Sequence, residues 1–129
     1  MYFRTPVFYD SVVSAPWEVI LDPEVNKWIV GLEDEIYDRV EAAIDMLSEH
    51  GPALGRPLVD TISGSKHSNM KELRVGTCRI LFAFDPARNA LLLVAGDKRG
   101  KWQEWYLESI PVADDRFDTW LHQWKELDQ

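Results

Sequence analysis

Basic side chains gather in one stretch of this chain, between residues 71 and 101. Arg74 and Arg79 stand five residues apart among apolar neighbours, and Lys98, Arg99 and Lys101 follow further along. An arginine guanidinium is a planar fork that makes two charge-assisted hydrogen bonds to a phosphate group at fixed geometry. If the fold brings these cations together, they predict a site that binds phosphate or an acidic partner segment.

The strands predicted around these cations would place them at one edge of a sheet. Residues 72–85 are rich in β-branched and aromatic types and predict two strands joined by a tight turn at 75–77. A second turn is predicted at 85–89, where a proline presets the φ angle. Residues 90–95 are apolar on both faces and predict a third, central strand covered by helices.

A helical hairpin is predicted before this sheet, after a short strand over residues 17–21. Asp22 and Pro23 mark the first helix start, with Asp as the N-cap and Pro at the first helical position. The second helix should end near residues 50–52, where Gly caps it and Pro prevents continuation. Its apolar residues keep helical spacing at Ile36, Val40, Ile44 and Leu47. The outer face of this hairpin is acidic.

Composition and spacing assign the remaining segments. Residues 53–69 are rich in Gly, Pro and Ser and predict a surface loop. Residues 102–107 predict a last strand segment, and Pro111 is expected to open a final helix with a wide apolar stripe. Residues 1–16 show no sustained period and are expected to form a flexible arm, which leaves 17–129 as a single domain.

Charge is polarised along the chain, which has 129 residues and a formal net charge of −8. Residues 56–101 carry nine Lys and Arg against four acids, so this segment has a charge of +5 and the remainder −13. An acidic average argues against a nucleic-acid ligand, but the basic segment reverses that argument locally. The single cysteine, Cys78, excludes an intrachain disulfide, and no apolar run approaches membrane-spanning length. A cytoplasmic protein is therefore expected.

The order of motifs resembles the RelE/ParE superfamily of toxin-antitoxin toxins, and within it the HigB-like, phage-derived branch. The resemblance covers roughly residues 17–124 and rests on GRPLVDTISGSKHSNMKELRVGTCRILFAFDP, followed by LLLVAGDKRG and WYLESIP. Its most specific part is ELR, then RILFAF, then GDK. It implies an α+β fold in which a small, twisted antiparallel sheet packs on an N-terminal helical hairpin, with a C-terminal helix.

The resemblance also implies an activity and partners. Members of the family cleave messenger RNA on the ribosome, without a metal or other cofactor, and are neutralised by a cognate helix-turn-helix antitoxin. RNA can be cut when its 2′-hydroxyl attacks the adjacent phosphate, so the protein needs only to orient the backbone, stabilise the added negative charge and move two protons. Cations are sufficient for much of this work. No membrane partner is expected.

By resemblance, Arg79 matches the family's phosphate-stabilising arginine, with Arg74 and Lys71 beside it. Arg99 stands in the family's second basic cluster and is expected to neutralise the leaving oxygen or the scissile phosphate. Tyr106 matches an aromatic residue that stacks on a base or assists proton transfer, although its ordinary pKa near 10 requires perturbation for a base. The expected RNA-binding residues are Lys66, His67, Lys98, Lys101 and Trp102.

Other interpretations remain open from the sequence. Met70 and Glu72 stand where ribosome-dependent relatives have a basic strand, and Glu72 favours a ParE-like inhibitor of DNA gyrase. A non-catalytic interaction module with a basic strip is a third possibility. Arg74 and Arg79 could instead form ion pairs with acids of the helical hairpin or the last helix. His67 in a loop could simply be polar surface.

Overall fold

The structure is a computed structural model that describes residues 16–127, with side chains up to Gln123. The prediction of a flexible arm over residues 1–16 therefore falls almost entirely outside the described residues. Along the chain the helices and strands are β1 (Glu18–Leu21), α1 (Pro23–Val30), α2 (Asp34–His50), the 3-10 helix η2 (Gly51–Ala53), β2 (Val59–Thr61), β3 (Lys71–Val75), β4 (Cys78–Phe84), β5 (Asn89–Asp97) and α3 (Trp102–Leu127).

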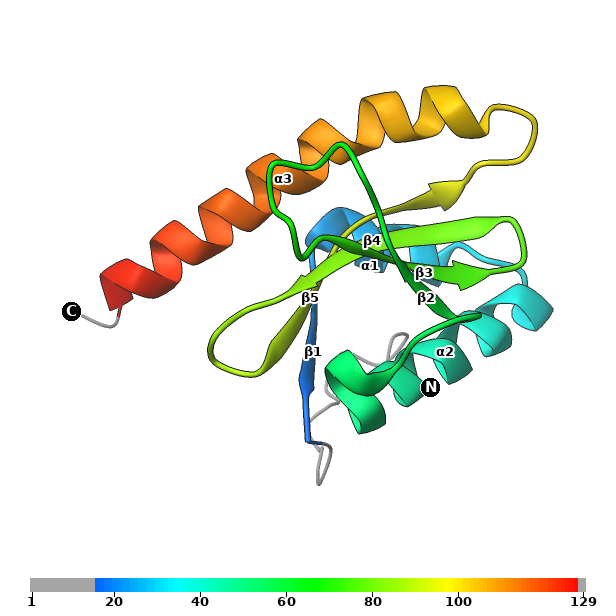
Figure 1. The fold of residues 1–129 in the computed structure, drawn as a ribbon. Coiled ribbons are helices and arrows are strands. Elements are labelled where there is room, and N and C mark those ends of the chain that lie inside the picture. Colours follow the sequence, from blue (N-terminus) through cyan, green and yellow to red (C-terminus); the bar gives the residue numbers. More distant parts are fainter. Residues whose placement is uncertain (1–15, 128–129) are drawn as a thin grey trace.

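The strands form one sheet in the order β1-β5-β4-β3-β2. All neighbouring pairs are antiparallel except β1 and β5, which run parallel. This confirms the predicted α+β fold, with a sheet between a helical hairpin and a C-terminal helix (Figure 1). The strand predicted over residues 90–95 is β5, and it lies between β1 and β4 as expected for a strand that is apolar on both faces.

Two hydrophobic clusters form on opposite faces of the sheet, because successive side chains of a strand point to opposite sides. One cluster joins α1 and α2 to alternate residues of the strands, including Leu73, Ile80 and Leu92. The other joins α3 to the intervening residues, including Leu81 and Leu91. Figure 1 shows this arrangement, with α3 crossing one side of the sheet and the α1–α2 hairpin on the other.

The predicted ends of the helical hairpin are confirmed. The side chain of Asp22 accepts a hydrogen bond from the backbone N–H of Glu24, as an N-cap should. Helix α2 ends at His50, and its C-cap is Gly51, whose φ of +56° favours glycine. A Cβ at this position would lie 2.2 Å from Nε1 of Trp17. Glycine therefore both permits the turn and admits the indole ring against the end of the helix.

Two of the predicted boundaries are wrong. Residues 102–107 do not form a strand but the first turns of α3, which continues through Pro111. Pro111 is exposed, so the backbone hydrogen bond that it removes lies on the solvent side. Packing supports this longer helix, because Ser109, Ala113 and Phe117 are buried at four-residue spacing. The predicted loop over residues 53–69 contains β2, which pairs with β3.

No helix within residues 16–127 combines the length and the apolar character that a membrane span requires.

Candidate functional site

A buried carboxylate, Glu72, lies at the centre of a polar cluster on the α3 side of the sheet. Its side chain is only 5% exposed. Arg74 Nε donates to Glu72 Oε2 at 2.8 Å, and the hydroxyl of Tyr106 donates to Glu72 Oε1. Nε of Arg79 lies 3.7 Å from Glu72 Oε1. These four residues, Glu72, Arg74, Arg79 and Tyr106, are called the Glu72 cluster below.

Strand register explains why these side chains meet. Residues 72 and 74 point to the same face of β3, and Arg74 lies directly opposite Arg79 in the β3–β4 pair. The predicted hairpin therefore does bring the two arginines together. Arg79 in turn lies opposite Gly96 of β5. A Cβ on Gly96 would lie 2.5 Å from Nε1 of Trp105, so glycine lets α3 approach and deliver Tyr106 to the cluster.

The guanidinium of Arg79 donates hydrogen bonds through Nη1 but not through Nε. Its Nη1 donates to the carbonyl oxygens of Gly76 at 2.7 Å and Cys78 at 2.9 Å. Its Nε is buried and has no hydrogen-bond partner among the described residues, because 3.7 Å to Glu72 is too long for a hydrogen bond. The side chain is 13% exposed. Arg79 therefore keeps a charged donor available inside a poorly solvated site.

Tyr106 is a donor in this cluster. Burial, followed by the hydrogen bond to Glu72 and the charge of Glu72, raises the pKa of the Tyr106 phenol to about 12. The expected perturbation is thus present, but its direction favours the protonated phenol. At neutral pH Tyr106 can give a proton or a hydrogen bond, and Glu72 is the group placed to accept one.

Arg74 is tied to acids of the sheet. Besides Glu72, its Nη2 donates to Asp60 Oδ2 of β2 at 3.1 Å, and Arg56 lies 3.2 Å from the same oxygen. The acids that pair with Arg74 thus come from β2 and β3, and not from the helical hairpin or the last helix as the alternative reading expected. The pKa of Asp60 is lowered, first by its hydrogen bond with Arg56.

A groove with a volume of about 630 Å³ opens beside the Glu72 cluster. The chain after β2 forms one wall, the first turns of α3 form the other, and Glu72 and Tyr106 lie between them. The walls are mainly apolar, and Trp102 and Leu107 are 54% and 76% exposed. The groove gives a ligand access to the cluster from solvent.

Three cations follow β5: Lys98 lies near Trp102 of the groove, and Arg99 and Lys101 lie in the loop between the end of β5 and the start of α3. Nζ of Lys98 lies 5.9 Å from the centre of the Trp102 ring, and Lys101 is exposed. Arg99 is 74% exposed, and its Nη2 lies 3.2 Å from Oδ2 of Asp97. The structure thus pairs Arg99 with Asp97 and places no atom of it in the Glu72 cluster.

Three predicted site residues lie elsewhere. Lys66 Nζ and His67 Nε2 lie 2.6 Å and 2.7 Å from the carboxylate of Asp118 in α3. These contacts fasten the β2–β3 loop to the helix and explain the lowered pKa of Asp118, to which Lys66 contributes most. Lys71 alternates with Glu72 along β3, so it shares the strand face of Leu73, which packs toward α1 and α2.

Sequence reasoning missed two features of the site. Glu72 was noted only as a departure from a basic strand, whereas in the fold it organises the cluster. The second feature is Arg39, which is the only Lys or Arg in helix α2. Its guanidinium lies over Gly76, and a Cβ on that glycine would be 3.5 Å from Arg39 Nη2.

Comparison with known proteins places this chain in a family. Residues 27–118 match the phage-derived Gp49-like proteins, and the chain belongs to that family. It is 53% identical over 118 residues to "Putative toxin HigB2" of Mycobacterium tuberculosis (strain ATCC 25618 / H37Rv), an alignment that covers 88% of this chain and 58% of that protein. It is also 53% identical over 105 residues to "Putative toxin HigB3" of the same organism, covering 80% and 92% of the two chains.

Solved structures support the same fold. The chain resembles one from the archaeal RelE-RelB complex of Pyrococcus horikoshii OT3 with a TM-score of 0.56 and 19% identity, over 67% of this chain and 98% of that chain. It also resembles a chain from the RelB-RelE antitoxin-toxin complex of Methanococcus jannaschii, with a TM-score of 0.53 and 13% identity, over 67% of this chain and 98% of that chain. The family match and the two HigB relatives confirm the resemblance to the HigB-like branch, and the solved structures show that the chain has a RelE-like fold.

Proposed function

We propose that this chain is the toxin of a type II toxin-antitoxin system and acts as a cytoplasmic, ribosome-dependent mRNA endoribonuclease. Family membership and the toxins that it resembles support the first part. One observation carries the second part: two arginines and a protonated phenol converge on a buried carboxylate beside an open, apolar groove.

The proposed reaction uses the RNA's own nucleophile. The 2′-oxygen attacks the adjacent phosphorus, the bond from phosphorus to the 5′-oxygen breaks, and a 2′,3′-cyclic phosphate and a 5′-hydroxyl result. One proton leaves the 2′-hydroxyl and one arrives at the departing 5′-oxygen. Negative charge on the phosphoryl oxygens increases in the transition state, so preorganised cationic donors accelerate the step.

Residues of the Glu72 cluster fit these tasks. Arg79 has a buried Nε without a hydrogen-bond partner among the described residues, and we assign it to the phosphoryl oxygens. Arg74 assists from the opposite strand position. Tyr106, protonated because its pKa is raised to about 12, donates to the 5′-oxygen. Glu72 accepts hydrogen bonds from Arg74 and Tyr106 in the resting site. It is the carboxylate of the cluster, and we assign it to accept the proton that leaves the 2′-hydroxyl.

The groove and its rim would bind the RNA around this site. Trp102 offers an exposed aromatic face on which an unstacked base can lie, with Lys98 beside it. Lys101 and Arg99 add positive charge at the same end of α3. We assign no catalytic role to Lys66 and His67, because both bind Asp118. We also assign none to Lys71, which lies on the face of β3 opposite to that of Glu72.

Induced expression in a bacterial host tests this proposal. The wild type should arrest growth and produce in-frame mRNA cuts when 5′ ends are mapped. Arg79→Ala should abolish both. Lys27→Ala, which removes an exposed cation of α1 distant in sequence from the site, should behave like the wild type. Arrest without cuts would contradict the nuclease.

A second candidate function follows from the same cluster. Glu72 already satisfies Arg74 and Tyr106, so the basic residues are less free for phosphate than in a strand without an acid. This favours a ParE-like inhibitor of DNA gyrase, or a binding module that does not catalyse. A supercoiling assay with purified gyrase separates these two, because only the first should inhibit the enzyme.

We further propose that a helix-turn-helix antitoxin neutralises this chain by covering the basic strip. The solved relatives are complexes of RelE with the antitoxin RelB, which supports a proteinaceous partner. Binding of the antitoxin should protect Arg99, which is 74% exposed, from arginine-directed modification. Full neutralisation with unchanged modification of Arg99 would show that the partner binds elsewhere.

A further inference from the structure

Arg39 brings a cation from the acidic helix α2 to the β3–β4 turn. Helix α2 carries six acids and no other Lys or Arg. Nη2 and Nη1 of Arg39 would lie 3.5 Å and 3.6 Å from a Cβ placed on Gly76. Arg79 Nη1 donates to the carbonyl oxygen of the same glycine at 2.7 Å. Guanidinium groups from a helix and from a strand therefore flank one residue.

The start of the β5–α3 loop adds more positive charge to this turn. The backbone N–H of Lys98 donates to the carbonyl oxygen of Thr77 at 3.1 Å, which ties the loop to the turn. Burial is the main cause that raises the pKa of the Cys78 thiol, and the charge of Asp97 also raises it. The charges of three arginines lower this pKa: Arg39, Arg99 and Arg79. Three separate elements thus deliver cations to one place.

This convergence of cations favours the binding of an anion. Arg79 Nη1 lies 2.7 Å from the carbonyl oxygen of Gly76, and Arg39 Nη2 lies 3.5 Å from the Cβ position of the same residue. These two points of Gly76 are at most about 4 Å apart, so the two guanidinium groups lie within about 11 Å of each other. That distance is comparable with the Debye length of about 8–10 Å, so their positive potentials add. Two acids pair with these cations: Asp97 lies 3.2 Å from Arg99, and Glu72 lies 3.7 Å from Arg79. The cations Arg39, Arg79, Lys98 and Arg99 still outnumber these two acids.

Arg39 does not pair with Glu35, the acid one helical turn before it. Glu35 precedes it by four residues in α2, an arrangement that stabilises helices when the two side chains pair. Among the described side chains, those of residues 16–123, no ion pair within 4.0 Å joins Arg39 to Glu35 or to another acid. The guanidinium reaches over the turn instead. Its position there is consistent with a ligand outside the chain.

We infer that Arg39, together with Lys98 and Arg99, binds a second phosphate of the RNA backbone, next to the phosphate held by Arg79. The inference rests on the proposed nuclease function and extends it, because it adds a binding site from the helical hairpin. Arginine suits this ligand since its fork matches phosphate oxygens. It also explains how an acidic protein approaches RNA, since the cations of the hairpin and the sheet meet on one side.

Salt-dependent binding to single-stranded RNA tests the inference. The probe is a fluorescein-labelled 2′-O-methyl RNA, in which the blocked 2′-oxygen prevents cleavage. The logarithm of affinity falls linearly with the logarithm of salt concentration, with a slope of about −0.7 for each phosphate contact on a single strand. Arg39→Ala should therefore give a slope about 0.7 shallower than that of the wild type. Arg39→Lys, which keeps the charge, should retain most of the slope.

Lys27→Ala is the matched control, because it removes one exposed cation from the same helical layer. Its slope should equal that of the wild type, and all variants should unfold at the same temperature. An unchanged slope in Arg39→Ala, or a wild type that does not bind the probe, would overturn the inference. Binding that depends on Arg39 without cleavage of unmodified mRNA on ribosomes would refute the nuclease instead and leave the phosphate site standing.

Discussion

Replacement of Glu72 by glutamine tests whether this carboxylate organises the cluster. Gln has nearly the same shape, but its amide has one acceptor oxygen and a donor that faces Arg74 or Tyr106. One of the two hydrogen bonds to Glu72 is therefore lost, and a hydrogen bond to a charged group contributes about 1.5–3 kcal/mol. Arg74 is 37% exposed, so water replaces part of the loss. We expect Glu72→Gln to lower the free energy of unfolding by about 2 kcal/mol.

Urea unfolding of the purified protein measures this change, with Glu104→Gln as an isosteric control at an exposed position of α3. The control should stay within about 0.5 kcal/mol of the wild type, as surface substitutions do. Ultraviolet titration adds a second readout. Two of the three causes that raise the pKa of Tyr106 come from Glu72, so this pKa should fall below its value of about 12, although burial, the largest cause, still raises it. A stability loss no larger than that of the control, with an unchanged phenol titration, would refute the reasoning.

Three further results are expected. Gly96→Ala should destabilise the protein by about 1–3 kcal/mol and shift tryptophan emission, because the new Cβ would lie 2.5 Å from Nε1 of Trp105; unchanged urea unfolding would contradict this. Because the pKa of Tyr106 is raised, the contribution of its phenol to stability is complete below pH 10 and is lost as the pH rises toward 12. In alkaline unfolding experiments, Tyr106→Phe should remove this pH dependence of stability. Asp118→Asn should lower the melting temperature at pH 7 but not at a pH well below 3.8, since the folded-state pKa of Asp118 is depressed, mainly by Lys66; an equal loss at both pH values would argue against the ion pair.

The strands and the helical hairpin were predictable because their signals are local. Period-2 patterning around Arg74 and Arg79 and the cap residues Asp22 and Gly51 each act within a few positions of the chain. Pro111 misled the prediction of α3 because proline usually marks a first turn. An exposed proline is tolerated here inside a helix whose other side packs on the sheet.

The site was only partly predictable, because its members depend on register and on long-range docking. Sequence spacing indicated that Arg74 and Arg79 meet, but not that Glu72 would lie between them and a phenol from α3. Tyr106 reaches the cluster from 34 positions along the chain. Lys66 is predicted to bind RNA, and the sequence does not indicate its ion pair with Asp118 of α3. Charge alone could not reveal that contact, since both residues lie in segments that look solvated.

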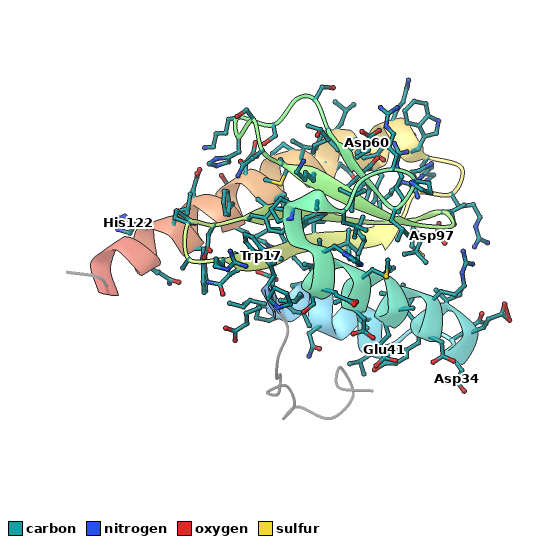
Figure 2. All side chains as sticks on the ribbon, turned by 60° about the horizontal axis from the view of Figure 1, so that its bottom comes forward. Trp17, Asp34, Glu41, Asp60, Asp97 and His122 are labelled. Carbon is teal, nitrogen blue, oxygen red and sulfur yellow. The ribbon has the colours of Figure 1, made fainter. Side chains whose placement is uncertain are left out.

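Figure 2 shows side chains on the sheet and on the helices of both sides. The Glu72 cluster takes its members from the sheet and from α3. Its arginines belong to strands packed on both hydrophobic clusters, whereas Tyr106 is held only while α3 stays docked. Detachment of α3 would thus dismantle the site while the sheet and the hairpin remain folded. Such partial opening is a distinct cooperative unit in amide hydrogen exchange. A ligand that bridges Arg79 and Tyr106 must stabilise the docked helix by its own binding energy, so exchange should slow as far away as Phe117.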